Sequence, residues 1–396
     1  MDIVILSHYC SDLSQTSNDR FMYLARMLSK NHHVEIVTSN FSHTTKHHRK
    51  TETVLPFNVT FLQEPGYRKN VCLSRFYSHF IWGRNVKKYL AKRKRPDVIY
   101  CAIPSLTGPY YASRYSESNN VRFVIDVQDL WPEAFRMVFN IPIVSDIIFK
   151  PFEYRANSIY KRTDAICAVS DTYCQRAQKV SKKCSNTTTV FLGTELETFD
   201  RYAEDESILK KEENEIWIGY CGTLGSSYDI HCAIDAISIV DDPRLKFIVM
   251  GDGPKMNEFK QHATMKNINV VFTGRLQYNE MCSLLKQCDI NINPIVHGSA
   301  GSIINKHADY AASGKPVVSS QESREYRELV EKYHMGFNCD NNNAKSMAEK
   351  IKLLVDDEVL RIQMGANARK CAEECFDRKQ TYQKLVEVIC AADSTK

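Results

Sequence analysis

The stretch Gly298–Ser320, GSAGSIINKHADYAASGKPVVSS, places a loop of small residues directly before a helical pattern. The helix is predicted over Ile304–Ser313, because Gly314 ends the pattern and Pro316 prevents it from resuming. Small residues let the backbone approach a ligand, and the first turn of a helix offers unpaired amide groups and the positive end of the helix dipole. The stretch therefore predicts an anion-binding loop and helix.

Two charged side chains follow within this helix. Lys306 lies in the first turn and Asp309 comes three residues later, so both side chains project from one face. A cation beside free amides suits a diphosphate, and a carboxylate one turn further suits the hydroxyl groups of a ribose. We therefore predict a nucleotide-sugar site. The alternative is an ordinary Gly/Ser-rich loop before a core helix, with Lys306 and Asp309 as a solvated ion pair.

The composition is that of a globular protein with more than one domain. The 396 residues exceed one usual core, and 43% of them are hydrophobic. The longest apolar run, Ile141–Phe149, contains Asp146 and is too short to cross a bilayer, and no cationic leader precedes the first strand pattern. We expect a cytoplasmic protein. The fourteen cysteines lack the spacing of disulfide or metal motifs, so reduced thiols and no metal site are expected.

Charge is distributed unevenly along the chain. Of the 52 Lys and Arg and 47 Asp and Glu, residues 1–200 hold 27 and 18 (net +9), which leaves 25 and 29 (net −4) for residues 201–396. Many of the cations lie between Lys46 and Arg95, interleaved with aromatic residues and ending in the run Lys92–Arg95. This segment could lie on the anionic inner face of the cell membrane or form an ordinary solvated helix. Nucleic acid is not expected, since no recognition motif accompanies the cations.

Short apolar strands alternate with helical stretches in both halves, which predicts parallel sheets with helices on both faces. In the first half we expect strands at Asp2–Ser7, His33–Thr38, Asp97–Ala102, Val121–Val127, Asp164–Ser170 and Thr188–Leu192. In the second half we expect them at Ile216–Cys221, Leu245–Gly251, Val270–Thr273, Ile290–Asn293 and Pro316–Ser319. The charged segment 201–215 is predicted as a hinge between domains 1–200 and 216–376, and a helix within 377–396 is expected to complete the first domain.

Ligands of open α/β sheets bind at the carboxyl ends of the strands. In the first half, Ser17 and Asn18 precede a helix there, and Asp126–Glu133 places three carboxylates around Trp131. These residues could bind an acceptor, with the carboxylates on sugar hydroxyls and the Trp131 ring against a sugar face. The alternative for the acidic stretch is a helix start with acidic residues in its first turn.

In the second half, several glycine-bearing loops follow strands and can converge on Lys306. The candidate donor-binding residues are Gly222, Thr223, Ser226, Gly251, Gly253, Arg275, Leu276, Pro294, Ser299, Gly301, Ser302 and Ile303, together with Lys306 and Asp309.

With these loops in place, the chain resembles the family-four glycosyltransferases of the two-Rossmann (GT-B) type over nearly its whole length. The motifs that carry the resemblance occur in the family's order: DVQDLWPE from Asp126, GYCGTLGSSYD from Gly219, FIVMGDGP from Phe247, FTGRL from Phe272 and NKHADYAASGKPVVSS from Asn305. The resemblance implies an α/β fold of two doubly wound, Rossmann-like domains facing across a cleft. The Asn-Lys-x-x-Asp-Tyr pattern is similar to the branch that builds bacterial surface polysaccharides, capsules and O-antigens.

The same resemblance implies a retaining, metal-independent and cofactor-free hexosyl or N-acetylhexosaminyl transfer from a nucleotide sugar, with UDP favoured, to a lipid-linked or glycan acceptor. Asp309 would bind the ribose, and Lys306 with the backbone of residues 299–303 would hold the diphosphate and the donor sugar. Gln128, followed by Asp129, stands where family members often have a histidine near that sugar, so these two and Lys306 are the catalytic candidates.

Two departures from the family pattern bear on function. Thr223 and Ser226 stand in the loop where many members have an Arg and a Lys, and Gly301 stands at the first position of a glutamate pair that many members share. The alternatives are a nucleotide-sugar epimerase or hydrolase of the same fold, or a non-catalytic subunit.

Overall fold

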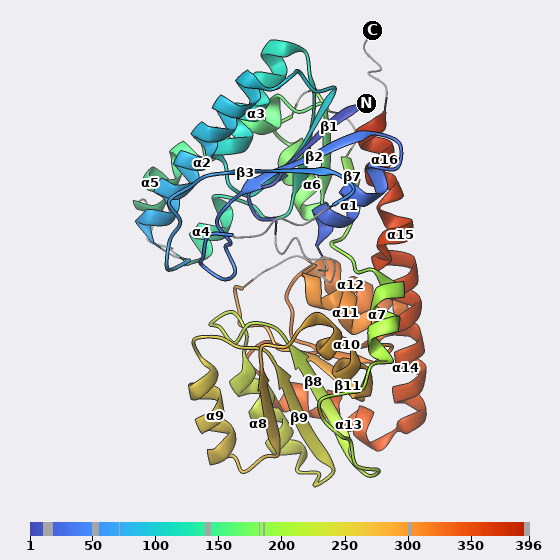
Figure 1. The fold of residues 1–396 in the computed structure, drawn as a ribbon. Helices are drawn as coiled ribbons and strands as arrows, with labels where there is room; N and C mark the ends of the chain where they lie inside the picture. The colour runs from blue at the N-terminus through green and yellow to red at the C-terminus, as the bar shows by residue number, and fades with distance from the viewer. Residues whose placement is uncertain are drawn as a thin grey trace. The chain divides into compact units, whose positions relative to one another are not determined.

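The computed structural model describes residues 1–10, 19–49, 55–70, 72–138, 144–181, 183–184, 187–299 and 303–391. The chain forms two compact units. The N-terminal unit contains Met1–Phe191 and the C-terminal segment from Tyr382, and the C-terminal unit contains Leu192–Thr381 (Figure 1). The chain therefore passes between units at residues 191/192 and 381/382, and the segment 201–215 lies wholly inside the C-terminal unit.

A seven-stranded parallel sheet organises the N-terminal unit, in the order β3-β2-β1-β4-β5-β6-β7. Its strands are β1 (Asp2–Leu6), β2 (His33–Ser39), β3 (Asn58–Leu62), β4 (Val98–Ile103), β5 (Arg122–Val127), β6 (Ala165–Ala168) and β7 (Thr187–Thr189). The sequence predicts six of them to within three residues, because strands covered on both faces read as continuous apolar runs. The prediction omits β3, an edge strand that is only half-buried.

Helices cover both faces of this sheet (Figure 1). They are α1 (Arg20–Leu28), α2 (Leu73–Lys92), α3 (Thr107–Asn119), α4 (Glu133–Val138), α5 (Val144–Lys161), α6 (Asp171–Gln178) and α16 (Gln383–Cys390). One core cluster joins the sheet to α2, α3, α5 and α6, and a second joins it to α1 and α16. The last helix thus packs on the N-terminal unit although it begins at Gln383, far along the chain from β7, the last strand of that unit.

A buried ion pair fixes the start of α1. Asp19 caps the helix by accepting from the amides of Phe21 and Met22. The Arg20 guanidinium donates to Asp126 at the end of β5 through Nε at 2.8 Å and Nη2 at 3.0 Å. Burial alone would lower the pKa of Arg20, but the charge of Asp126 outweighs it and holds that pKa well above its usual value. This pair fastens α1 to the carboxyl edge of the sheet.

The cationic run at the end of α2 is partly used within the fold. Arg93 is a half-buried residue whose side chain donates to Glu35 at 2.7 Å and to Asp2 at 2.6 Å. The run Lys92–Arg95 therefore does not present four free cations. In the described residues, no helix has both the length and the apolarity needed to cross a bilayer.

A six-stranded parallel sheet organises the C-terminal unit, in the order β10-β9-β8-β11-β12-β13. Its strands are β8 (Ile216–Cys221), β9 (Leu245–Met250), β10 (Val270–Gly274), β11 (Ile290–Asn293), β12 (Val317–Ser319) and β13 (Gly336–Asn338). Five agree with prediction to within one residue, and the edge strand β13 is not predicted. In both sheets the order reverses beside the first strand, at β1 and at β8, which is the point where doubly wound sheets bind ligands.

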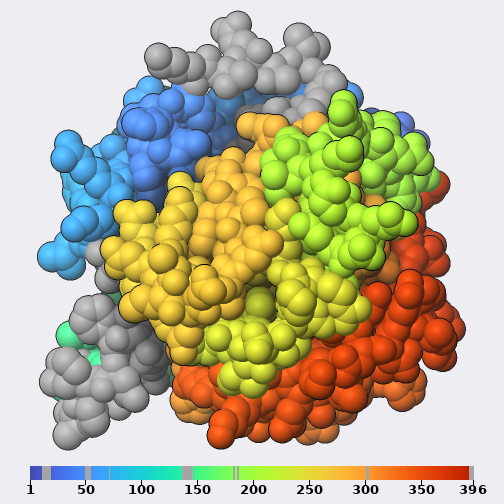
Figure 2. All heavy atoms as spheres, turned by 90° about the horizontal axis from the view of Figure 1, so that it is seen from below, coloured from blue at the N-terminus to red at the C-terminus, as the bar shows by residue number. Residues whose placement is uncertain are grey.

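The helices of this unit are α7 (Leu196–Ala203), α8 (Ile230–Val240), α9 (Met256–Met265), α10 (Tyr278–Gln287), α11 (Asn305–Ala312), α12 (Arg324–Tyr333), α13 (Ala344–Asp356), α14 (Glu358–Cys371) and α15 (Arg378–Thr381), with a π-helix at Ala372–Phe376. Figure 2 shows the yellow-green surface around α8 beside the orange-red surface of the C-terminal helices, in keeping with the packing of α8 against α13. No disulfide links any of the fourteen cysteines, all of which lie in the described residues, and eleven of them are buried.

Candidate active site

Three glycines let the loops after β8 and β9 pack backbone against backbone. A Cβ atom at Gly251, whose φ is +153°, would lie 1.9 Å from the carbonyl oxygen of Gly222. A Cβ atom at Gly253 would lie 2.3 Å from the carbonyl oxygen of Leu224. Close approach therefore requires glycine at these positions whether or not a ligand binds. The predicted donor residues Gly222, Gly251 and Gly253 are brought together at the carboxyl edge of the sheet.

Lys306 is buried in the first turn of α11, with only 7% of the residue exposed. Its Nζ atom lies 4.1 Å from the centroid of the Tyr220 ring and 3.8 Å from that of Tyr228. A Cβ atom at Gly222 would lie 2.8 Å from Nζ, so the amine points at the loop after β8. Within the part of the chain that the structure describes, Nζ has no hydrogen-bond partner.

This environment weakens the proton affinity of the amine. Burial lowers the pKa of Lys306 to about 7, against the opposing influence of Cys221. The faces of two aromatic rings attract a cation, but they replace water only in part. The amine therefore occupies a position where an added negative charge would restore its protonated form.

Asp309 is also buried, but it has a partner. The Tyr278 hydroxyl of α10 donates to its Oδ1 at 2.9 Å, and the same hydroxyl lies 2.8 Å from Oγ1 of Thr194. Burial raises the pKa of Asp309 to about 6, although hydrogen bonds from Tyr278 and Thr194 oppose the rise. Since both residues are buried and the Lys306 amine has no hydrogen-bond partner among the described residues, the alternative of a solvated Lys306–Asp309 pair is wrong.

The start of α11 is held by buried polar contacts. His307 accepts from the Ile304 amide through Nδ1 at 3.2 Å, and its ring stacks on Tyr326 with centroids 3.5 Å apart. Its Nε2 lies 3.1 Å from Nδ2 of Asn293 at the end of β11. The loop leading to this helix is anchored where the Gly298 amide donates to Glu322 at 2.9 Å. These contacts fix the helix whose first turn carries Lys306.

The other predicted donor residues lie around this position or outside the described part. Thr223, Ser226 and Arg275 are exposed, and Arg275 makes no hydrogen bond or ion pair with any described residue. Leu276 is half-buried and Ile303 is buried. The carbonyl of Pro294 accepts from the Asp229 amide at 3.1 Å, and the amide of Ser299 donates to the carbonyl of Val296. Gly301 and Ser302 lie outside the described residues, as do Ser17 and Asn18 of the predicted acceptor site.

The predicted residues after β5 are engaged within the N-terminal unit. Gln128 donates through Nε2 to Asp126 at 3.0 Å. Asp129 accepts from the Leu130 amide at 2.9 Å and from Nε1 of Trp131 at 3.2 Å, and burial raises the pKa of its carboxyl group. Trp131 is 4% exposed, so its ring is not an open platform for a sugar.

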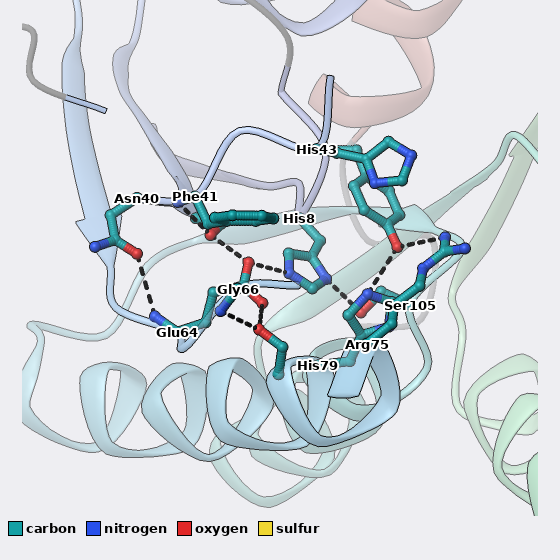
Figure 3. Close-up of polar contacts among 12 residues, drawn as sticks. His8, Asn40, Phe41, His43, Glu64, Gly66, Arg75, His79 and Ser105 are labelled. Atoms are coloured by element: carbon teal, nitrogen blue, oxygen red, sulfur yellow. Dashed lines mark hydrogen bonds and ion pairs between the residues drawn. The ribbon is translucent and has the colours of Figure 1, made fainter. Parts of the chain in front are cut away.

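A buried network that the sequence does not predict surrounds His8 (Figure 3), and the neighbouring His79 ring stacks on Trp131. His8, after β1, contacts Glu64 through Nε2 at 2.8 Å and Ser105 through Nδ1 at 2.7 Å. The order Glu64–His8–Ser105 has the connectivity of a nucleophile triad. However, Ser105 is fully buried and the His8 ring stacks on Trp82 with centroids 4.1 Å apart. A substrate could not reach this serine, so the network connects the sheet to α2.

Comparison with known proteins identifies the family. The model described as "Glycosyl transferases group 1" matches residues 202–371, and that described as "Glycosyltransferase Family 4" matches residues 20–196. The chain belongs to glycosyltransferase family four. Because the two models match successive parts that lie mainly in the C-terminal and N-terminal units, the predicted family and glycosyltransferase class are confirmed.

Over the aligned parts, curated relatives are about a quarter identical to this glycosyltransferase. It is 23% identical over 319 residues to "Probable glycosyltransferase WbjE" of Pseudomonas aeruginosa, covering 76% of each chain. It is 24% identical over 197 residues to "Capsular polysaccharide biosynthesis glycosyltransferase CapM" of Staphylococcus aureus, covering 47% of this chain and 50% of that one. The match to an uncharacterized glycosyltransferase of Methanocaldococcus jannaschii is 23% identical and covers 42% of this chain and 44% of that one. The chain thus spans about half the length of CapM and of the Methanocaldococcus jannaschii protein.

Solved structures share the whole fold. Anabaena HepE, in complex with UDP and glucose, superposes with a TM-score of 0.71 at 16% identity, covering 99% of this chain and 100% of that one. WaaG, a glycosyltransferase involved in lipopolysaccharide biosynthesis, superposes with a TM-score of 0.70 at 14% identity, covering 98% and 100%. The predicted fold of two Rossmann-like domains is therefore confirmed.

Proposed function

We propose that this glycosyltransferase moves a hexosyl or N-acetylhexosaminyl group from a UDP-sugar to a lipid-linked or glycan acceptor in the synthesis of a cell-surface polysaccharide. The observation that carries the proposal is the buried, unpartnered amine of Lys306 at the start of α11. A buried cation is costly unless it is paired, and a diphosphate would supply the missing charge. HepE is described in complex with UDP, and CapM is described as acting in capsular polysaccharide biosynthesis.

The chemistry follows from charge that develops on the leaving group. As the bond between the anomeric carbon and the diphosphate oxygen breaks, negative charge grows on the diphosphate. Lys306 and the amides at the start of α11 would stabilise that charge. The acceptor oxygen forms the new bond on the same face of the sugar, and its proton passes to the departing phosphate. This mechanism gives retention and needs neither a protein nucleophile nor a metal ion.

The other predicted residues take positioning roles in this proposal. Asp309 would bind the ribose hydroxyls, while the exposed Thr223, Ser226 and Arg275 are free to contact the nucleotide or the sugar. Gln128 and Asp129 lie at the carboxyl edge of the other sheet, where an acceptor would enter, and both are held by hydrogen bonds. Their roles would be to orient the sugar or the acceptor hydroxyl.

The test is donor binding, followed by the effect of removing the amine. We expect UDP and a UDP-sugar to raise the melting temperature selectively in a screen of nucleotides, because a ligand of the folded state stabilises it by mass action. Lys306→Met should weaken UDP about 100-fold, since a buried charge-assisted contact contributes roughly 3 kcal/mol. The melting temperature without ligand should not fall, because Met fills the space without a buried charge.

Lys345→Met is the matched control, because Lys345 is an exposed lysine of α13 in the same unit. Its UDP affinity should equal that of the wild type. Equal UDP affinity for the Lys306 and Lys345 variants would overturn the donor site. Incubation with a UDP-sugar and a membrane extract separates the alternatives: UDP release with sugar transfer supports the transferase, release without transfer indicates hydrolysis, and binding without turnover indicates a non-catalytic subunit.

A further inference from the structure

Two cysteines lie one turn apart where α14 runs into the π-helix of the C-terminal unit. Cys371 is the last residue of α14 and is fully buried, whereas Cys375, in the π-helix, is half-buried. Four residues of a helix advance by about 6 Å, which is inside the range of about 4.4–6.8 Å between the Cα atoms of a disulfide. A π-helix inserted in a helical segment is also frequent at functional sites. The pair is therefore spaced so that its two sulfur atoms can meet.

The two thiols are in direct contact. The Cys371 thiol donates a hydrogen bond to the sulfur of Cys375. Because this bond stabilises the thiolate of Cys375, it lowers the pKa of Cys375 and raises that of Cys371. Burial opposes the first change and adds to the second. The pair thus divides into one sulfur that ionises readily and one that keeps its proton.

The other groups that face Cys375 come from α12 and from the π-helix itself. The Tyr333 hydroxyl, at the end of α12, lies 3.2 Å from the sulfur of Cys375 and donates to Glu374 at 2.6 Å. The charge of Lys332 lowers the pKa of Cys375, while the charge of Glu374 raises it. Since these two charges oppose each other, the contact with Cys371 is the feature that sets Cys375 apart.

The other half-buried cysteines have different neighbours. They are Cys72 and Cys390, since the remaining cysteines of the chain are buried, and buried thiols are unreactive. The sulfur of Cys72 donates to the Lys69 carbonyl at 3.0 Å, and that of Cys390 lies 3.4 Å from Nε2 of His32. Among the hydrogen bonds of the described residues, neither sulfur contacts a second thiol. Cys375 is therefore the half-buried cysteine with a resolving partner at hand.

We propose that Cys371 and Cys375 form a reversible dithiol–disulfide pair, in which a peroxide oxidises Cys375 and Cys371 is the resolving thiol. Because Cys375 is half-buried, a small oxidant can reach its sulfur, and the adjacent thiol removes the oxidised form before it reacts further. In a reducing compartment such a pair stays open and closes only under oxidation. The inference goes beyond the proposed function and does not depend on donor binding.

Two steps lead to the disulfide. In the first, the Cys375 thiolate attacks one oxygen of hydrogen peroxide: the S–O bond forms, the O–O bond breaks and hydroxide leaves, which gives a sulfenic acid. In the second, the Cys371 sulfur attacks the Cys375 sulfur: the S–S bond forms, the S–O bond breaks, and the hydroxyl group leaves with the Cys371 proton as water. The dithiol is oxidised and the peroxide is reduced to water. A reducing thiol reopens the bond by thiol–disulfide exchange.

A single tryptic peptide contains the whole pair, because trypsin cleaves after Lys370 and Arg378 and releases CAEECFDR. The folded, full-length protein is treated with hydrogen peroxide, unfolded, alkylated at its free thiols and digested for mass spectrometry. We expect this peptide to lose two hydrogen atoms and to carry no alkyl group. Treatment with dithiothreitol before alkylation should restore both alkylated cysteines. A peptide that stays fully alkylated while Cys72 is oxidised overturns the proposal, and so does irreversible oxidation of Cys375 with Cys371 still alkylated.

The rate of alkylation tests which sulfur attacks first. In the reduced, folded protein at pH 7, Cys375 should react with iodoacetamide at least about tenfold faster than Cys390, because the thiolate is the nucleophile and burial raises the pKa of Cys390. Equal rates at the two cysteines would contradict the assignment of Cys375 as the attacking sulfur. The same peptide map measures both rates from the alkylated fraction at successive times.

Variants separate the two roles. Cys371→Ala should oxidise more slowly, because the donor to Cys375 is gone, and should stop at a sulfenic acid that dimedone traps. Cys375→Ser should leave Cys371 reduced and alkylated. Cys390→Ser is the matched control, since it removes a half-buried thiol from another helix, and it should form the disulfide as the wild type does. Loss of the disulfide in this control would overturn the pair. Where a variant melts early, the peptide map of the wild type decides.

Discussion

The carboxyl edges of the two sheets treat buried charge in opposite ways. In the N-terminal unit, Arg20 and Asp126 form a buried pair, joined at 2.8 and 3.0 Å. In the C-terminal unit, the Lys306 amine is also buried, lies against the rings of Tyr220 and Tyr228 and has no hydrogen-bond partner among the described residues. The Arg20–Asp126 pair is compensated within the protein, whereas in the proposed donor site the charge of Lys306 would be compensated by the bound anion.

This difference separates residues that support the fold from residues that await a ligand. Charge compensated by the chain contributes to the folded state, and its loss leaves a partner buried and unpaired. A buried charge that the chain leaves uncompensated does not stabilise the fold, and its desolvation cost is offset when an oppositely charged ligand binds.

The largest expected effect tests the compensated side. Asp126→Asn should lower the free energy of unfolding by about 3–5 kcal/mol, because it leaves the Arg20 guanidinium buried without its counter-charge. Urea unfolding of the full-length protein measures this change. Glu117→Gln is the matched control, since it breaks an exposed pair with Arg162, and its cost should stay below about 1 kcal/mol. Similar costs for both variants would erase the distinction between buried and exposed pairs here.

The next effect tests the uncompensated side through pH. The pKa of free Lys306 is lowered to about 7, so the amine is neutral above that pH and must take up a proton when UDP binds. The affinity for UDP should therefore fall about tenfold per pH unit between pH 7 and 9, a range above the second phosphate pKa of about 6. Calorimetry in buffers of different ionisation enthalpy would also detect the proton uptake.

The groups around the amine do not titrate in this range. Burial raises the pKa of Cys221 to about 12 and raises the pKa values of Tyr220 and Tyr228 from their usual value, while that of Asp309 is raised only to about 6. Lys306→Met should therefore bind UDP weakly and independently of pH from 7 to 9. A steep pH profile that persists in this variant would assign the proton to another group.

Local sequence signals predict the parts of this molecule that are set by local geometry. The strands β8 and β11 agree with prediction at both ends, because strands buried on both faces are apolar throughout. The helix α11 is predicted to within one residue because small residues precede it and Gly314 follows. The edge strands β3 and β13 are missed, since both are only half-buried and neither reads as a continuous apolar run.

The surroundings of the charges come from distant parts of the chain and could not be predicted. Lys306 contacts Tyr220 and Tyr228, which lie on β8 and its loop some eighty residues earlier. Trp131 follows β5, and its neighbour His79 comes from α2. A carboxylate-rich loop suggests an open ring for sugar binding, but only the packing of His79 of α2 and Phe135 of α4 shows that Trp131 is buried. The sequence does contain one hint of these contacts, because Tyr220 and Tyr228 both belong to the GYCGTLGSSYD motif that begins at Gly219.

A smaller effect concerns the space around the amine. Gly222→Ala should lower the affinity for UDP about tenfold and the stability by about 1–2 kcal/mol, because its φ of +145° strains an L-residue. The new Cβ atom would also lie 2.8 Å from Nζ of Lys306 and 3.1 Å from the Tyr220 hydroxyl. Gly225→Ala serves as the control, since its Cβ atom would meet only Thr223, at 3.8 Å. If the control loses as much UDP affinity, crowding of Lys306 is not the cause.

The smallest effect tests whether Asp309 belongs with the ligand-dependent charges or with the compensated ones. Asp309→Asn should weaken UDP about fivefold and leave inorganic pyrophosphate unchanged, because one hydrogen bond to a ribose contributes about 1 kcal/mol. The fold should tolerate the change, since the amide oxygen of Asn can still accept from Tyr278. The folded pKa of Asp309 lies above its unfolded value of 3.8, so the stabilising protonated form is lost as pH rises through about 6. The variant should therefore be at least as stable as the wild type at pH 7.5, and a fall in stability with no change in UDP affinity would place Asp309 with Asp126 as a residue of the fold.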